Sequence, residues 1–292
     1  MKKILLVVAI SMLTGYAFAQ KTYNLQFKPK QGEKYDAVTN MKSTIKQSMM
    51  GQEMVVDLIY DVDMLYDITK SDENTSMNMT YTKLSMDMAM MGQNIKMSSE
   101  DPDDSNPASK SFKSLKGSTL SIIIAPDGKV TDVQGTDALA EKFADLSLEE
   151  KEALKIFISK ENIKSMMEQS FKMFPDKPVK VGDSWASSVI LESPYKLTSN
   201  NTYKLLQVEN GVALVDVTGT LSTNGPKKMT TNGMEISVDL SGSQKGVMEL
   251  DQDSGTAKSS KMKQVLSGKM EVMGQEIPME VVSDIDLKMT KK

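Results

Sequence analysis

The stretch VVDLIYDVDMLYDI, residues 55–68, decides the fold class. Every second residue from Val56 to Ile68 is apolar. The positions between them carry four acidic residues, namely Asp57, Asp61, Asp63 and Asp67. A repeat of two residues marks a β-strand with one dry face and one wet face. Such alternation is typical of antiparallel sheets that are solvated on one side.

Other parts of the chain repeat this pattern. Residues 234–240 and 277–289 alternate between apolar and polar side chains in the same way. Between Met77 and Met91 the apolar positions change from odd to even numbers, which predicts a bulge or break near Lys83. Because bulges bend a sheet, we expect long antiparallel strands that curl toward a half-barrel.

A helical segment interrupts the strands. Residues 137–175 have helical spacing, and Ser147 with Glu150 forms a candidate capping box near its start. The stretch from Glu100 to Pro107 is polar and acidic, and it predicts a loop. We therefore predict a first antiparallel β half at 20–136, a helical segment at 137–175 and a second β half at 176–292.

The two β halves open with related motifs. Gly32-Glu33-Lys34-Tyr35 begins the first half, and Gly182-Asp183-Ser184-Trp185 begins the second. The similarity indicates an internal repeat. The predicted fold class is therefore mainly β with one helical segment (α+β), as two related curled antiparallel sheets or half-barrels joined through a helix.

The start of the chain is typical of a secretory signal peptide. Lys2 and Lys3 precede an apolar run that is too short to span a bilayer, and Ala17-Phe18-Ala19 forms an A-x-A cleavage pattern. We expect residues 1–19 to be removed near Ala19 and the mature protein to be periplasmic or secreted. No later apolar run is long enough for a transmembrane segment.

The composition excludes much chemistry. The chain has no histidine and no cysteine, and all 35 basic residues are lysine. Imidazole bases, thiolate nucleophiles and bidentate arginine clamps are therefore absent. The net charge of −4 disfavours nucleic acid as a partner. We expect no enzymatic activity, no catalytic residues, no cofactor and no metal site built from the usual ligands.

Methionine, in contrast, is abundant, with 25 residues in the chain. The tripeptide Met-Gly-Gln occurs three times, at residues 50–52, 91–93 and 273–275, between alternating segments. Each copy predicts a tight hairpin turn with glycine at positive φ. Apolar tips of this kind are expected to be covered by the helix, to meet one another or to face a partner.

Three interpretations of the methionines stay open. They are a plain strand core, the lining of a cavity for an apolar ligand, or a copper(I) site made of the thioethers of Met86, Met88 and Met90. The candidate ligand-binding residues are those of the methionine-rich alternation, namely Met77, Met79, Met86, Met88, Met90 and Met91.

The paired G-[E/D]-x-[Y/W] openings, the strand-rich halves and the exported start resemble an uncharacterised family of envelope proteins of Gram-negative bacteria. The expected curled sheets with a helix are also similar in shape to the open-barrel periplasmic lipoprotein carriers. Neither resemblance implies a functional residue.

The leading functional prediction is a non-enzymatic exported protein that shelters a lipid or other apolar molecule, such as an acyl chain. The alternatives are a structural or interaction protein with an envelope protein as partner, and a copper(I)-binding protein.

Overall fold

The computed structural model describes residues 21–292, except residues 50, 104, 145–150, 152–153, 155–156, 193–194 and 232–233. The signal peptide, the capping box of Ser147 and Glu150, and Met50 lie outside the described residues. In the described part, no helix has the length and apolarity needed to cross a membrane.

Most of the described chain is extended. The first half contains β1 (Thr22–Tyr23), β2 (Lys34–Met49), β3 (Gln52–Ser71), β4 (Thr75–Met90), β5 (Gln93–Ser98), β6 (Thr119–Ile124) and β7 (Val130–Gln134). The second half contains β8 (Val179–Lys180), β9 (Ser184–Leu191), β10 (Leu197–Glu209), β11 (Val212–Ser222), β12 (Lys227–Thr231), β13 (Met234–Asp251), β14 (Ala257–Val272) and β15 (Gln275–Lys291). The helices are α1 (Pro107–Leu115), α2 (Thr136–Lys142) and α4 (Lys160–Phe171). The predicted class, mainly β with a helical segment, is confirmed.

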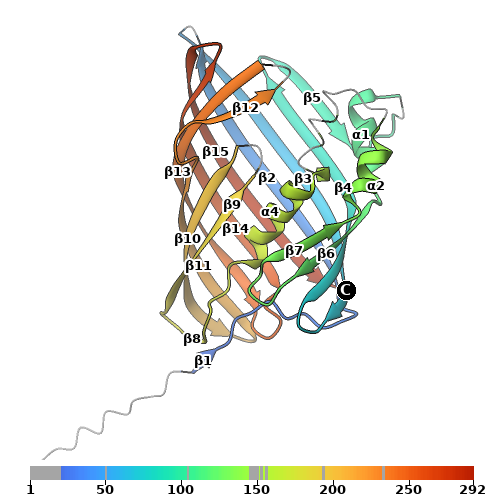
Figure 1. Ribbon diagram of the computed structural model, residues 1–292, viewed down its shortest axis with the longest axis vertical. Coiled ribbons are helices and arrows are strands. Elements are labelled where there is room, and N and C mark those ends of the chain that lie inside the picture. Colours follow the sequence, from blue (N-terminus) through green and yellow to red (C-terminus); the bar gives the residue numbers. More distant parts are fainter. Residues whose placement is uncertain are drawn as a thin grey trace, which may run out of the picture.

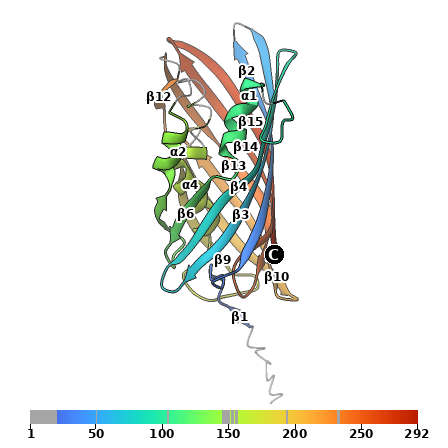
Figure 2. The ribbon, with the colours of Figure 1, turned by 90° about the vertical axis from the view of Figure 1, so that its right-hand side faces the viewer.

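One antiparallel sheet of 13 strands forms the body of the molecule (Figure 1). Its main path runs β7-β6-β4-β3-β2-β15-β14-β13-β11-β10-β9, with β5 beside β4 and β12 beside β13. A separate pair, β1 and β8, lies at one end of the molecule. The tilted strands curl around the helices, as Figure 2 shows from the side.

The two β halves meet edge to edge. β2 pairs with β15 from Tyr35 opposite Lys291 to Gln47 opposite Met279. The halves are therefore joined through this ladder as well as through the helical segment, a contact that the sequence pattern did not predict.

The predicted bulge in the methionine-rich strand is confirmed. Asp63 faces Lys83, whereas the next residue, Met64, faces Tyr81, so one residue of β4 is left over. This extra residue moves Met79 and Leu84 to the same buried face although one is odd and the other even.

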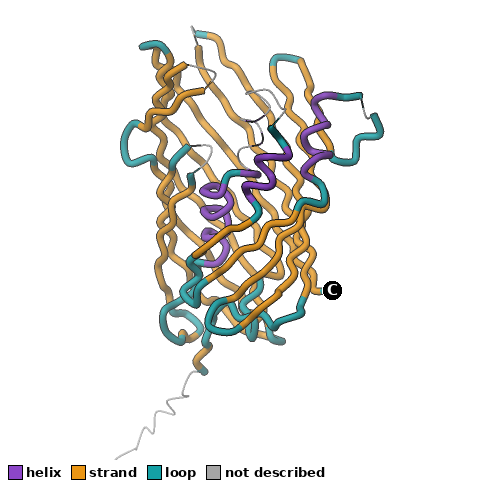
Figure 3. The backbone as a smooth tube through the Cα atoms, turned by 45° about the vertical axis from the view of Figure 1, so that its right-hand side comes forward, coloured by secondary structure: helices purple, strands orange, loops and turns teal. Residues whose placement is uncertain are grey.

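Helix α4 lies on the open side of the curled sheet. It contacts β7 and β9, the two ends of the main strand path. At β7, the amide of Val130 donates to the Glu168 carboxylate at 3.1 Å, and just after β9 the amide of Glu192 donates to Ser165 Oγ at 3.2 Å. Figure 3 shows this helix inside the curve of the strands. The helix thus covers the gap between the sheet edges.

The opening motifs of the two halves adopt the same turn. The amide of Lys30 donates to the Glu33 side chain at 2.9 Å, and the amide of Lys180 donates to the Asp183 side chain at 2.8 Å. In each turn the glycine amide also donates to a strand carbonyl, on Ile68 in the first half and on Leu205 in the second. The acidic residue of each motif therefore closes its own turn.

The buried apolar residues form three clusters. The first joins β2–β7 to the helices around Tyr81, Phe112 and Phe157. The second lies in the second half around Tyr203 and Val217, and the third lies further along the same strands around Leu221 and Leu240. Each cluster also takes in residues of the other half, such as Leu287 in the first, Leu25 in the second and Ile45 in the third, and the candidate site lies between the first and second clusters.

Candidate functional site

A cavity of about 230 Å³ lies between α4 and the concave face of the sheet. Its walls come from both halves, because β2, β3, β4 and β15 line one side and β10, β11, β13 and β14 line the other. Eight of the lining residues are methionines, namely Met64, Met77, Met166, Met167, Met173, Met248, Met262 and Met289. No charged residue lies among the described lining residues.

The walls combine rigid and adaptable side chains. Phe27 packs on Phe171 with ring centroids 4.4 Å apart, which fixes the chain before β2 against α4. Trp185 stacks on Tyr203 at 5.8 Å and donates its indole N–H to the carbonyl of Met173 at 2.7 Å. Methionine has an unbranched and polarizable side chain, so the remaining wall can adapt to contents of varied shape.

The cavity adjoins a polar hollow of about 890 Å³. Both hollows are lined by Tyr35, Thr256, Ala257, Leu287 and Met289. The shared lining places the polar hollow directly beside the apolar cavity, and we call this hollow the mouth.

The mouth lies where two neighbouring strands separate. The β14–β15 ladder ends at Ser259 opposite Lys288, whereas β15 stays paired with β2 as far as Lys291. β14 instead continues toward the turn at residues 252–256. The sheet wall therefore divides next to Tyr35.

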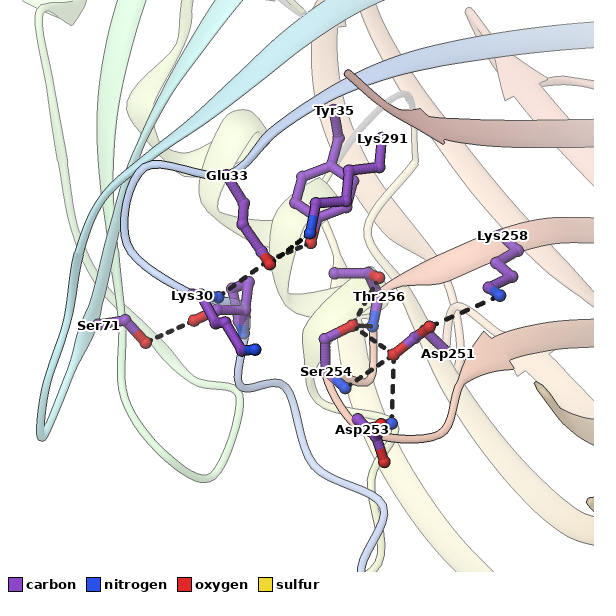
Figure 4. A network of polar contacts seen from close by, with 11 residues as sticks. Lys30, Glu33, Tyr35, Ser71, Asp251, Asp253, Ser254, Thr256, Lys258 and Lys291 are labelled. Carbon is purple, nitrogen blue, oxygen red and sulfur yellow. Dashed lines mark hydrogen bonds and ion pairs between the residues drawn. The ribbon is translucent and has the colours of Figure 1, made fainter. Parts of the chain in front are cut away.

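Polar side chains close around this division (Figure 4). The Tyr35 hydroxyl donates to Glu33 at 2.5 Å, and Lys291 Nζ donates to the other Glu33 oxygen at 2.6 Å. Burial would by itself raise the pKa of Glu33, but the hydrogen bonds from Lys291, Tyr35 and the Lys30 amide outweigh it and the pKa lies below its ordinary value. Burial and the neighbouring Glu33 raise the pKa of Tyr35, so its hydroxyl stays protonated.

On the opposite side of the mouth, Asp251 organises the turn. Its carboxylate accepts from the amide of Ser254 at 3.0 Å and from the hydroxyl of the same residue at 2.9 Å. Burial opposes ionisation of Asp251, yet these bonds and Lys258 lower its pKa overall. The mouth is thus charged, whereas the cavity behind it is not.

The predicted site residues are spread over different surroundings. Met77 is buried and lines the cavity, and Met79 is buried in the first core cluster. Met86 packs partly buried against that cluster, opposite Met97 of β5. Met88 and Met90 are half-buried near the far end of β4. The structure brings only Met77 of the six to the cavity wall.

Met91 belongs to the hairpin tips. The β4–β5 turn has φ of 51° at Met91 and 79° at Gly92, and the β14–β15 turn has 53° at Met273 and 79° at Gly274. Positive φ at both central residues defines the type I′ hairpin turn, so the predicted turns are confirmed. Met91 and Met273 are 81% and 88% exposed. No described residue covers them, although the sequence predicted that such tips would be covered by the helix, meet one another or face a partner.

Most cavity methionines were not singled out from the sequence. Met166, Met167 and Met173 lie in and after the helical segment, and Met248 and Met262 lie on strands whose alternation is broken by lysine and glycine. Met289 could have been predicted to face the interior, because it continues the alternation of residues 277–289. Placement of the rest depends on α4 docking across the sheet edges.

The fold and the cavity together define the class of the molecule. It is a mainly β protein whose open, curled sheet surrounds an apolar cavity. Residues 72–257 match the model of a family of unknown function, DUF6263. The chain belongs to this family, which agrees with the resemblance to an uncharacterised family. No curated protein matches the sequence.

Solved structures with a related shape were found. A structure of lipovitellin, described for its lipid–protein interactions, is similar at a TM-score of 0.52 and 10% identity, over 89% of this chain and 25% of lipovitellin. The chain thus spans about a quarter of that relative. An outer membrane channel from Pseudomonas putida F1 gives a TM-score of 0.25 at 7% identity, over 91% of this chain and 98% of the channel. An exported protein with a YmcC-like fold from Bacteroides fragilis NCTC 9343 gives 0.17 at 7% identity, over 90% of this chain and 97% of the other. The last two scores are too low to define a shared fold.

Proposed function

We propose that the protein is a non-enzymatic, exported binding protein that shelters one apolar molecule, such as an acyl chain, in the methionine-lined cavity. The observation that carries this proposal is the cavity itself, which is walled by eight methionines and lacks charged lining residues. Burial of an apolar guest against such walls contributes about 25 cal/mol per Å² of apolar surface.

The size of the cavity suits a single chain or ring. An apolar cavity of roughly 150 Å³ already takes up a benzene molecule in another protein. The volume of about 230 Å³ leaves room for a somewhat larger group, and the adjoining mouth has room for the rest of an elongated molecule.

The likeness to lipovitellin supports the same proposal at the level of fold. That protein's structure was described for its interactions with lipid, and the shared part covers most of this chain.

Displacement of a neutral fluorescent probe, N-phenyl-1-naphthylamine, by 1-decanol tests the proposal. We expect saturable binding with one site per chain. Thr39→Phe places a large ring in the cavity wall, and we expect it to weaken binding at least tenfold. Val38→Phe is the matched control, since Val38 is 37% exposed on the opposite face of the same strand and the change should leave binding as it is.

Failure of both ligands to bind the folded protein would contradict the proposal. Equal affinity in the Thr39→Phe and wild-type proteins, with unchanged circular dichroism, would place the bound molecule elsewhere. The structural and copper(I) alternatives stay as predictions from the sequence.

A further inference from the structure

A row of polar residues crosses the apolar concave face at one level of the sheet. Direct cross-strand neighbours run from β10 to β2 in the order Asn201, Gly219, Gln244, Gln264, Ser283 and Ser43. We call the five residues with side chains, Asn201, Gln244, Gln264, Ser283 and Ser43, the polar belt. All of them except the half-buried Gln264 are at most 7% exposed.

The polar belt divides two apolar regions. On β11, Val217 lies on the cavity side of the belt and packs in the second core cluster. Leu221 lies on the other side and packs in the third cluster. Gly219 stands between them at the level of the belt.

Hydrogen bonds hold the belt side chains in fixed directions. Gln244 Nε2 donates to Ser199 Oγ at 3.1 Å and also to Asn201 Oδ1. Gln264 Nε2 donates to Gln244 Oε1 at 2.8 Å, and the hydroxyls of Ser43 and Ser283 are 2.7 Å apart.

Gly219 makes room for this arrangement. A Cβ atom at this position would lie 2.1 Å from Asn201 Oδ1 and 2.7 Å from the carbonyl oxygen of Asn200. Any larger residue would therefore push Asn201 away from Gln244. The absence of a side chain here lets two amides meet across an intervening strand.

Stability alone does not require the polar belt. Hydrogen-bonded partners in a core can often be exchanged together for apolar groups of similar shape at little or no loss. A row of buried amides and hydroxyls in an otherwise methionine-rich wall therefore needs another reason.

Two groups near the belt keep unused hydrogen-bonding capacity toward the cavity. Tyr203 accepts from Asn201 Nδ2 at 3.3 Å, and within the described chain its own proton has no acceptor. Gln264 uses its amide nitrogen on Gln244, and its carbonyl oxygen has no donor among the described residues. Asn201, Tyr203, Gln244 and Gln264 all line the cavity.

We propose that the polar belt binds an uncharged hydrogen-bonding head group, a hydroxyl or an amide, on the apolar molecule in the cavity. Tyr203 donates to its oxygen, and the carbonyl of Gln264 accepts its proton. This inference rests on the proposed function and adds the chemical class of the ligand, a neutral single-chain amphiphile.

The charge of the surroundings selects against an ionised head group. The described cavity wall contains no lysine to compensate a carboxylate, and an unpaired charge in an apolar site is strongly disfavoured. Lysines line the mouth instead, and two of them, Lys291 and Lys258, pair with Glu33 and Asp251.

Affinities of three probes of equal chain length test the inference, namely 1-decanol, decane and decanoate at pH 8. We expect 1-decanol to bind roughly tenfold tighter than decane, as one or two net hydrogen bonds supply. Tyr203→Phe keeps the stacked ring and removes the donor, and we expect it to lower the preference for 1-decanol over decane about threefold to tenfold.

Two further variants complete the test. Gln264→Met removes the acceptor without a change in size, and it should lower the same preference if Tyr203→Phe fails to fold. Thr202→Val is the matched control, because Thr202 is exposed on the outer face between the two inward residues of β10. It should retain the full preference.

The outcomes separate this inference from the proposed function. Equal binding of 1-decanol and decane would overturn the head-group site while the apolar cavity stands. Tighter binding of decanoate than of 1-decanol would place the head at the charged mouth and also overturn it. Binding of none of the three probes would overturn the proposed function itself.

Discussion

At the scale of single residues, Gly128 shows how one position fixes the helix against the sheet. It has φ of 79° in the β6–β7 turn, and a Cβ there would lie 2.0 Å from the carbonyl oxygen of Phe171. Phe171 ends α4 and lines the cavity. A side chain at residue 128 would thus force this end of the helix away from the sheet.

Substitution of this glycine gives the first prediction. Gly117 has the same φ of 79° but open space around its Cβ position, so Gly117→Ala suffers the backbone strain alone. We expect Gly128→Ala to lower the free energy of unfolding by about 1–3 kcal/mol more than Gly117→Ala, because of the added overpacking. Urea unfolding of both variants measures the difference. Equal losses would show that the α4 end is not held against the turn.

Glu33, at the mouth of the cavity, makes a contribution to stability that depends on pH. Its folded-state pKa lies below the ordinary value of 4.5, so its ionised form contributes stability. With a depressed pKa, this contribution is complete above the unfolded pKa and is lost as the pH falls through the folded pKa.

Comparison of Glu33→Gln with the wild type tests this second prediction. The variant should be less stable than the wild type at about pH 7, and the difference should shrink as the pH falls through the folded-state pKa of Glu33. Chemical unfolding at a series of pH values measures it. A difference that stays constant over this range would assign the loss to packing and not to charge.

At the scale of elements, α4 depends on its N-cap. Ser159 Oγ accepts from the amide of Asn162 at 3.1 Å, and the helix then runs to Phe171. We expect Ser159→Ala to cost about 1 kcal/mol of stability and, since α4 covers the cavity, to weaken ligand binding. Ser170→Ala is the control for stability alone, because Ser170 is exposed near the far end of the helix but also lines the cavity. Chemical unfolding of the two variants measures this difference in stability. Equal stability of the Ser159→Ala and Ser170→Ala variants would contradict the capping role of Ser159.

Strand-level features were predictable from sequence. The alternation of residues 55–68, the bulge at Lys83 and the tight turns at Gly92 and Gly274 all follow from local rules, and the structure confirms them. Each depends on residues within a few positions of one another. Helix α1 was not predicted, because its short, Ser- and Lys-rich sequence, PASKSFKSL, has only two large apolar side chains, Phe112 and Leu115.

Long-range pairing was not predictable in the same way. The ladder of β2 with β15 joins residues 232 to 256 positions apart, from Gln47 with Met279 to Tyr35 with Lys291, and either strand could have remained a sheet edge. The polar belt depends on the register of six strands at once, so its residues appear unrelated in the sequence. The cavity arises from these registers and from α4, and of the six methionines named from the sequence only Met77 lines it.

At the scale of the whole molecule, the curled sheet and α4 together form a container. The sheet supplies a continuous wall from β7 to β9, and α4 covers the gap between these strands. The charged mouth at the β14–β15 division lies directly beside the apolar cavity. Stability and binding are therefore linked, since a molecule that binds only the folded state raises the free energy of unfolding.

The most direct measurement is a crystal structure with 10-bromo-1-decanol, located by the anomalous signal of bromine. We predict a bromine peak beside the methionines that line the cavity between α4 and the sheet, with the hydroxyl near Tyr203 and Gln264. A saturated crystal without bromine in this space, or a cavity closed by repacked methionines, would contradict the central claim that the molecule encloses an apolar guest.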